Sequence, residues 1–307
     1  MKKLFTTLVL VFATCLSYGQ SWKFYRSEFK FGLGASNFLG ELGGANQIGT
    51  NGIKDFEFSL TRPSFEAAYA YMITPYFKAR INGIYGRLKG DDALTKEIYR
   101  NNRNLHFRSP IVELSGLIEW YPFSEKIAHL YRLKGASGKK SSLLSPYFVA
   151  GIAGFWFSPR AKSPTTGKWV PLKPLCTEGQ GLPGGPKPYK TISVSIPMGI
   201  GIKYAMNKNW SIGFEITGRM TFTDYIDDVS GTYYNNTDIQ NSKGAEAAYF
   251  ANPTLNLIPP IVDGSIVIDP TGTGMQRGDP RDNDSYMFAI FSLNYRFLRY
   301  RHYQPKF

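Results

Sequence analysis

The chain has 307 residues, of which 43% are hydrophobic and 15% aromatic, and its formal net charge is +13 at pH 7. Three histidines and two cysteines offer little material for a catalytic triad or a disulfide framework. Because the sequence also lacks a Gly-rich phosphate loop, an HExxH pair and a CxxC pair, we predict no catalytic, cofactor-binding or metal-binding residues and no enzyme activity.

Residues 1–20 have the pattern of an export signal. Two lysines precede an apolar run over residues 4–16, and a short polar stretch follows. We therefore predict a signal peptide, whose removal takes away two lysines and lowers the formal charge from +13 to +11. The run is short for a signal anchor. A lipoprotein site at Cys15 is also disfavoured, because the preceding Thr14 is bulkier than the small residue that such sites carry.

The following domain, residues 21–298, shows the two-residue alternation of β-strands. Between Tyr76 and Arg87, and again from Trp210, nearly every second residue is apolar or aromatic and the residues between are polar. The same pattern predicts eight strands, most of them long enough for the roughly 9 to 11 residues of a tilted membrane strand. They lie near Phe29–Ser36, Arg62–Met72, Tyr76–Leu88, Arg108–Tyr121, Pro146–Phe157, Thr191–Tyr204, Trp210–Phe222 and Ser285–Phe297.

The connections between these strands favour an all-β, closed antiparallel transmembrane barrel. Tight turns at residues 73–75 and 205–209 alternate with long segments after the first, third, fifth and seventh strands. Periplasmic turns and long extracellular loops alternate in this way in outer-membrane barrels, whereas a soluble sandwich needs no such rhythm. Within the sixth strand, Pro197 cannot donate a ladder hydrogen bond, which predicts a bulge or a local break.

The alternation also predicts which side chains face outward and which face the lumen. The apolar members of each pair point toward lipid: Phe77, Ala79, Ile81, Tyr85, Val112, Leu114, Ile118, Trp120, Ile212, Phe214, Ile216, Phe291, Leu293, Tyr295 and Phe297. Aromatic residues near strand ends are predicted to form interfacial girdles, namely Tyr69, Tyr71, Trp120, Tyr121, Trp156, Trp210, Tyr286 and Tyr295.

The opposite face collects acids and bases: Lys30, Glu66, Lys78, Arg80, Glu113, Glu119, Lys203, Glu215, Arg219 and Arg296. Isolated charges in a confined space are costly to desolvate, so we expect an ion network across the lumen. Since eight strands enclose little more than their own side chains, the lumen should be a plugged polar core. A proton or solute path is the alternative.

The turn end of the predicted barrel carries two basic segments. The connection at residues 122–145 is longer than a periplasmic turn needs to be, and residues 299–307 form a basic periplasmic tail. The candidate partner-binding residues are Lys126, Arg132, Lys134, Lys139, Lys140, Arg299 and Arg301. Solvation beside anionic lipid head groups is an equal alternative. For an exported barrel we expect lipid or an acidic protein as partner, and no nucleic acid.

The long loops hold further candidate features. Six aspartates flank the longest loop and suggest either turn caps, which we favour, or oxygen ligands of a divalent cation: Asp224, Asp227, Asp228, Asp279, Asp282 and Asp284. The Pro-rich loop over residues 158–190 should be irregular, either mobile or packed over the barrel mouth. It contains Cys176, which we expect in a surface loop and which has no disulfide partner after signal removal.

Five motifs together resemble the PorG (SprG) family of the Bacteroidetes type IX secretion system: Asn37–Gly44, Tyr85–Asp92, Glu119–Pro122, Thr223–Tyr233 and Asp282–Phe288. The resemblance implies a non-enzymatic outer-membrane component that anchors or assembles the periplasmic ring of PorK and PorN (GldK and GldN in gliding bacteria), with other translocon components as further candidate partners. A small channel or OmpA-like structural barrel is the alternative, and a lipid-modifying barrel enzyme is a weaker one.

Overall fold

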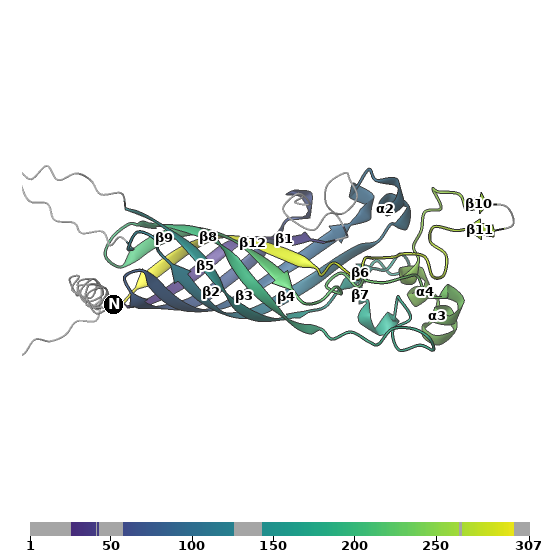
Figure 1. The fold of residues 1–307 in the computed structure, drawn as a ribbon, viewed down its shortest axis with the longest axis horizontal. Coiled ribbons are helices and arrows are strands. Elements are labelled where there is room, and N and C mark those ends of the chain that lie inside the picture. The colour runs from purple at the N-terminus through teal and green to yellow at the C-terminus, as the bar shows by residue number, and fades with distance from the viewer. Residues whose placement is uncertain (1–25, 41, 43–57, 126–142, 264–265, 298–307) are drawn as a thin grey trace, which may run out of the picture.

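The computed structural model describes residues 26–40, 42, 58–125, 143–263 and 266–297 (Figure 1). The predicted signal peptide and the basic tail lie outside these residues, as do all seven candidate partner-binding residues.

Eight antiparallel strands form a closed barrel (Figure 1). Each strand pairs with its chain neighbour, and β12 closes the barrel by pairing with β1, for example Gly32 with Ser292. The wall strands are β1 (Ser27–Leu39), β2 (Arg62–Thr74), β3 (Phe77–Asp91), β4 (His106–Trp120), β5 (Leu144–Phe157), β8 (Ile192–Ala205), β9 (Trp210–Thr221) and β12 (Ser285–Arg296). The predicted fold class is confirmed.

The strand boundaries differ from the predicted ones mainly at the loop end. There β3 continues to Asp91 and β4 begins at His106, so this hairpin extends beyond its neighbours. The extension was not predicted, because beyond Tyr85 the outward residues Arg87 and Lys89 are charged while the inward Leu88 is apolar, which reverses the apolar-outward pattern of the membrane strands.

The remaining elements gather at the loop end, where Figure 1 shows them beyond the barrel mouth. They are the helices α2 (Ile98–Arg103), α3 (Asn236–Lys243) and α4 (Ala245–Ala251), the short strands β6 (Arg160–Lys162), β7 (Trp169–Pro171), β10 (Ile261–Asp263) and β11 (Ile266–Ile268), and the 3₁₀ turns η3 (Phe58–Leu60), η4 (Asp92–Leu94) and η5 (Lys173–Leu175). In the part of the chain that the structure describes, no helix has both the length and the apolarity to cross a bilayer.

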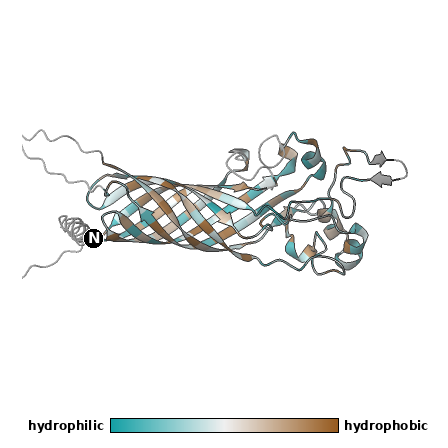
Figure 2. Ribbon diagram, viewed as in Figure 1, coloured by the Kyte–Doolittle hydropathy of each residue, from teal (hydrophilic) through white to brown (hydrophobic). Residues whose placement is uncertain are grey.

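The outer wall of the barrel is apolar. All fifteen residues predicted to face lipid are exposed or half-buried, and Leu114 and Phe291 are 66% and 68% exposed. Figure 2 shows hydrophobic and hydrophilic residues alternating along the wall strands. Aromatic side chains contact one another at the turn end, as in the pair Trp120 and Phe148 with ring centroids 5.5 Å apart.

The prediction of interfacial girdle positions is wrong for two residues. Tyr121 and Tyr286 are fully buried inside the barrel, where their hydroxyls donate to Glu119 at 2.6 Å and Glu113 at 2.9 Å. A tyrosine near a strand end fits either face, because its hydroxyl can be satisfied by water or by a buried carboxylate.

Pro197 interrupts one ladder without a bulge. On the β9 side it pairs in register with Arg219, whereas on the β5 side pairing stops at Met198 and resumes at Ser195 with the register unchanged. The predicted local break is therefore confirmed, and it falls at a residue that has no N–H to donate.

Candidate functional site

The barrel interior at the turn end holds a cluster of ten charged side chains, none more than 4% exposed. Arg80 lies at its centre. Its Nη1 is 2.8 Å from Glu119 Oε1 and 2.7 Å from Glu215 Oε2, while its Nη2 donates to Glu215 Oε1 at 2.8 Å. Such a fork-to-carboxylate contact is directional as well as strong, so Arg80 ties β3 to β4 and, across the lumen, to β9.

Lys30 provides a second junction in this cluster. Its Nζ lies 3.0 Å from Glu66 Oε2 and 3.1 Å from Glu215 Oε2. The Tyr147 hydroxyl of β5 donates to the same Glu215 carboxylate at 2.7 Å. With this contact, all eight wall strands contribute to the packed interior.

Two members of the cluster were missed in the sequence. Glu28 lies 2.9 Å from Lys78, 2.5 Å from Lys203 and 3.2 Å from Arg296. It precedes the predicted start of the first strand by one residue, and since it stands two positions before Lys30, extending the strand by that one residue would have assigned it to the lumen.

The other missed residue is Glu125, which follows β4 in the turn-end connection. Its carboxylate reaches into the barrel and lies 2.7 Å from Lys78 and 2.6 Å from Arg296. No periodic pattern marks a turn residue that folds inward, so the sequence held no signal for it. Glu125 is therefore part of the interior at the turn end of the barrel.

The cluster is balanced in charge. Five carboxylates face five cations: Glu28, Glu66, Glu119, Glu125 and Glu215 against Lys30, Lys78, Arg80, Lys203 and Arg296. The remaining two predicted lumen residues, Glu113 and Arg219, stand apart from it and pair with each other at 3.1 Å. The interior at this end therefore neutralises its own charge.

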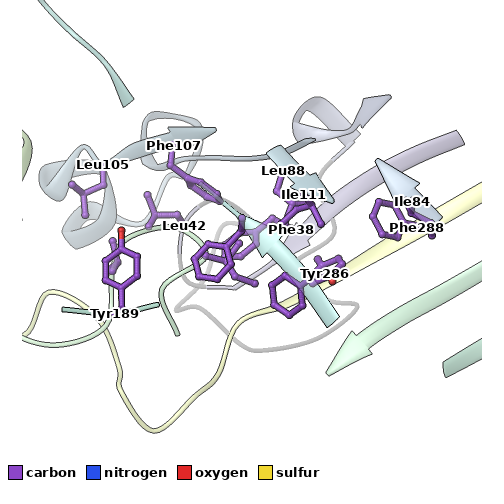
Figure 3. Close-up of a cluster of buried hydrophobic side chains, with 14 of the residues drawn as sticks. Phe38, Leu42, Ile84, Leu88, Leu105, Phe107, Ile111, Tyr189, Tyr286 and Phe288 are labelled. Atoms are coloured by element: carbon purple, nitrogen blue, oxygen red, sulfur yellow. The ribbon is translucent and has the colours of Figure 1, made fainter. Parts of the chain in front are cut away.

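The interior at the loop end is apolar, which differs from the uniformly polar lumen that we predicted. Figure 3 shows this cluster of inward-facing side chains. Within it the rings of Phe38 and Phe107 meet edge to face, with their centroids 4.9 Å apart. Its members are Phe38, Leu42, Ile84, Leu88, Leu105, Phe107, Ile111, Phe155, Phe157, Tyr189, Ile226, Val229, Tyr286, Phe288 and Ile290. Several belong to loops, so the loops close the mouth by packing into it.

The three longer loop segments, residues 91–105, 158–191 and 222–284, together form what we term the loop cap. Arg277 joins them: its Nη1 donates to Glu178 at 2.9 Å and to the backbone oxygen of Asp228 at 2.8 Å, and its own carbonyl accepts from Arg103 at 2.6 Å. Arg277 is only 2% exposed, so these contacts lie inside the loop cap.

The loop aspartates act as hydrogen-bond acceptors. Asp227 accepts from the N–H of Val229 at 2.9 Å, as expected for a turn cap. Asp284 instead accepts from the N–H of Ile226 at 2.8 Å and so links two distant segments. Asp228 accepts from the hydroxyls of Thr177 and Tyr189, both at 2.5 Å. Burial raises the pKa of Asp228 to about 6 in spite of these donors and the nearby Arg277.

Cys176 and the Pro-rich loop are more ordered than expected. The side chain of Cys176 is buried, although it lies in a loop. Residues 158–190 include β6, β7 and η5, and Leu172 packs with Ala161 and Phe250 of the cap. Of the two predicted alternatives for this loop, packing over the mouth is the observed one.

Comparison with known proteins adds limited information. Residues 185–249 match the model of a family described as a domain of unknown function (DUF6089), and no curated protein matches the chain. Similar solved structures include Ail, the attachment invasion locus protein of Yersinia pestis, at 9% identity and a TM-score of 0.37, covering 89% of this chain and 99% of that chain. The outer membrane protein OprG of Pseudomonas aeruginosa has 9% identity and a TM-score of 0.35, covering 90% and 98%. At these values the likeness concerns the fold class alone.

Proposed function

We propose that this chain is a non-conducting, non-enzymatic outer-membrane barrel that anchors a protein assembly on the periplasmic side. The membrane location is supported by the exterior. Large apolar side chains cover the wall strands and remain in contact with the surroundings, as for Ile152 at 75% exposure, and such a surface is stable only in an apolar medium.

The filled interior is the observation that supports a barrel without ion conduction. An ion crossing the barrel would have to separate paired charges at the turn end, since the five carboxylates and five cations leave no net charge to attract it. It would then meet the apolar cluster at the loop end, where it would lose its hydration shell without compensation. A narrow barrel filled in this way supports the scaffold reading over the channel reading.

The proposed anchoring surface is the turn end. The basic connection leaves the barrel at Glu125 and returns at β5, and the basic tail follows Phe297 at the same end. Both segments therefore join the barrel where a periplasmic partner would meet it. The motif resemblance suggests the type IX ring proteins PorK and PorN as that partner, and a basic surface suits an acidic docking face.

Charge reversal tests the docking. We expect a variant with Lys126, Arg132, Lys134, Lys139, Lys140, Arg299 and Arg301 changed to Glu to lose most ring protein in co-purification from the outer membrane, and to reduce secretion as a deletion does. A matched control reverses Lys168, Lys187 and Lys190, which lie on the loop cap at the opposite end. Equal ring recovery from both variants would refute docking by these segments.

Planar-bilayer recording tests the scaffold reading separately. The purified barrel should give no discrete conductance steps at either polarity. Regular conductance steps recorded from the purified folded protein would show that the barrel is a channel and not a scaffold, whatever the outcome of the ring experiment.

A further inference from the structure

Three cations stand side by side on the outer wall at the loop end. The strand register places Lys89 of β3 opposite Arg108 of β4, and Arg108 opposite Arg160 of β6. We call these three residues the outer basic row. Directly opposed side chains in an antiparallel sheet lie about 5 Å apart, where like charges destabilise the pairing. A sheet that keeps two such contacts in succession carries a cost that a bound anion would relieve.

The neighbouring charges do not cancel the row. Lys89 contacts Asp91 at 3.1 Å, but Arg87, on the same outward face of β3, adds another positive charge within electrostatic reach of Arg108. The local balance therefore stays strongly positive, unlike the interior, where acids and bases are matched.

One guanidinium group of the outer basic row is held by an aromatic ring. Arg108 stacks on the ring of Trp169 with its Cζ 4.4 Å from the ring centroid. The Nε of Arg160 is enclosed by protein and has no hydrogen-bond acceptor among the residues that the structure describes. Beside the row, Arg87 Nε donates to the Tyr85 hydroxyl at 3.3 Å. An arginine stacked as Arg108 is loses little freedom when it binds an anion.

The position of the outer basic row along the barrel axis indicates which kind of anion it meets. Tyr85, Val112 and Trp156 form one register row across β3, β4 and β5 and all face outward. Each cation of the outer basic row lies four residues beyond one of them, about 13 Å along a strand. With the usual tilt of about 40°, this is roughly 10 Å above the last apolar position, close to the head-group layer that flanks a hydrocarbon core of about 30 Å.

We propose that the outer basic row binds the phosphate group of an anionic lipid in the outer leaflet. Arg108 and Arg160 would each offer a fork of N–H donors to phosphate oxygens, Lys89 would add a point charge, and the acyl chains would lie against Tyr85, Val112 and Trp156. The inference rests on the proposed outer-membrane location, since it needs the apolar wall to be immersed in lipid.

The test is a thermal titration of the folded full-length protein in a neutral detergent with diphosphoryl lipid A as the probe. The native chain should gain thermal stability with increasing lipid. R108Q/R160Q should bind about thirty-fold more weakly, the factor expected for two cations lost near an anionic surface. Without lipid, this variant should melt at the same temperature as the native chain or higher, because the like-charge contacts are gone; a purely structural role for the arginines would lower it.

The matched control is K187Q/K190Q, which removes two exposed lysines from the loop cap and should titrate like the native chain. Folding of each variant is checked by its gel mobility before and after heating. Equal lipid affinity in R108Q/R160Q and the native chain would overturn the proposal, as would an equal stabilisation by inorganic phosphate, which would indicate a free-anion site. A chain that stays soluble without detergent would instead refute the membrane location and so the proposed function.

Discussion

The two ends of the barrel interior are filled by different means. At the turn end, ten charged side chains satisfy one another in a network whose geometry is set by hydrogen bonds. At the loop end, aromatic and aliphatic side chains fill the same cross-section by shape. Ion networks are directional and tolerate no missing member, whereas apolar packing depends on volume and relaxes in part when a side chain is shortened. The turn end therefore depends on paired charges and the loop end on packed volume.

The largest effect should come from removing the central cation of the ionic end. R80M leaves Glu119 and Glu215 without their shared partner, and we expect a loss of about 3 to 5 kcal/mol in the free energy of unfolding. Urea unfolding in detergent, followed by the mobility of the folded band, measures it. R80M/E215Q restores the balance of charges and should recover part of the loss. A single variant within 1 kcal/mol of the native chain would show that the network does not stabilise the barrel.

Shortening an apolar side chain at the loop end should cost less. Phe107 is fully buried against Phe38, so F107A should lower the free energy of unfolding by about 3 kcal/mol through the cavity it leaves. The same urea assay measures the change, which should not depend on salt. F222A, which removes an exposed ring at the same end, is the control and should cost under about 1 kcal/mol.

The pH dependence of the loop cap should be smaller still. Burial raises the pKa of Asp228 to about 6 in the folded cap, whereas an unfolded aspartate titrates near 3.9. The folded state therefore binds the proton more tightly, so this group contributes stability below about pH 4, and the contribution is lost as pH rises through 6, by at most about 3 kcal/mol.

Limited proteolysis of the cap loops at pH 4.5 and pH 7.5 checks this. With a protease active at both values, the native cap should be cut faster at pH 7.5, and D228N, which cannot ionise at that position, should show a weaker dependence. A native cap that is cut equally at both values would contradict the assigned protonation.

The smallest effect concerns the interrupted ladder between β5 and β8. P197A restores an N–H at the position where the pairing lapses, opposite Gly151 and Ile152, and should change the free energy of unfolding by less than about 1 kcal/mol. Hydrogen exchange should nevertheless slow at Ile152 and its neighbours. Unchanged exchange there would mean that the break has a cause other than the missing donor.

The difference between the two ends also explains how far the sequence predicts the structure. Alternation is strong where one face meets lipid and the other carries charge, so the strands and the lumen residues of the turn end, such as Lys30 and Glu215, are readable from the pattern. At the loop end the inward residues are apolar, as at Ile84 and Leu88, and the outward ones include the charged Arg87 and Lys89, so the pattern reverses.

What could not be predicted depends on contacts between segments distant in the chain. Arg277 becomes the centre of the cap only because the loops at Glu178 and Arg103 meet it, and Glu125 enters the lumen from a turn. Neither position has a local signal, since each is placed by contacts with residues that lie far away in the chain.

The contact between Glu28 and Arg296 spans the seam where the first and last strands meet. Neither side chain can find this partner until the final strand has docked on the first one. A sheet that had not yet joined its edges would lack this ion pair, so the closing step of the cylinder also completes the network of charges inside it.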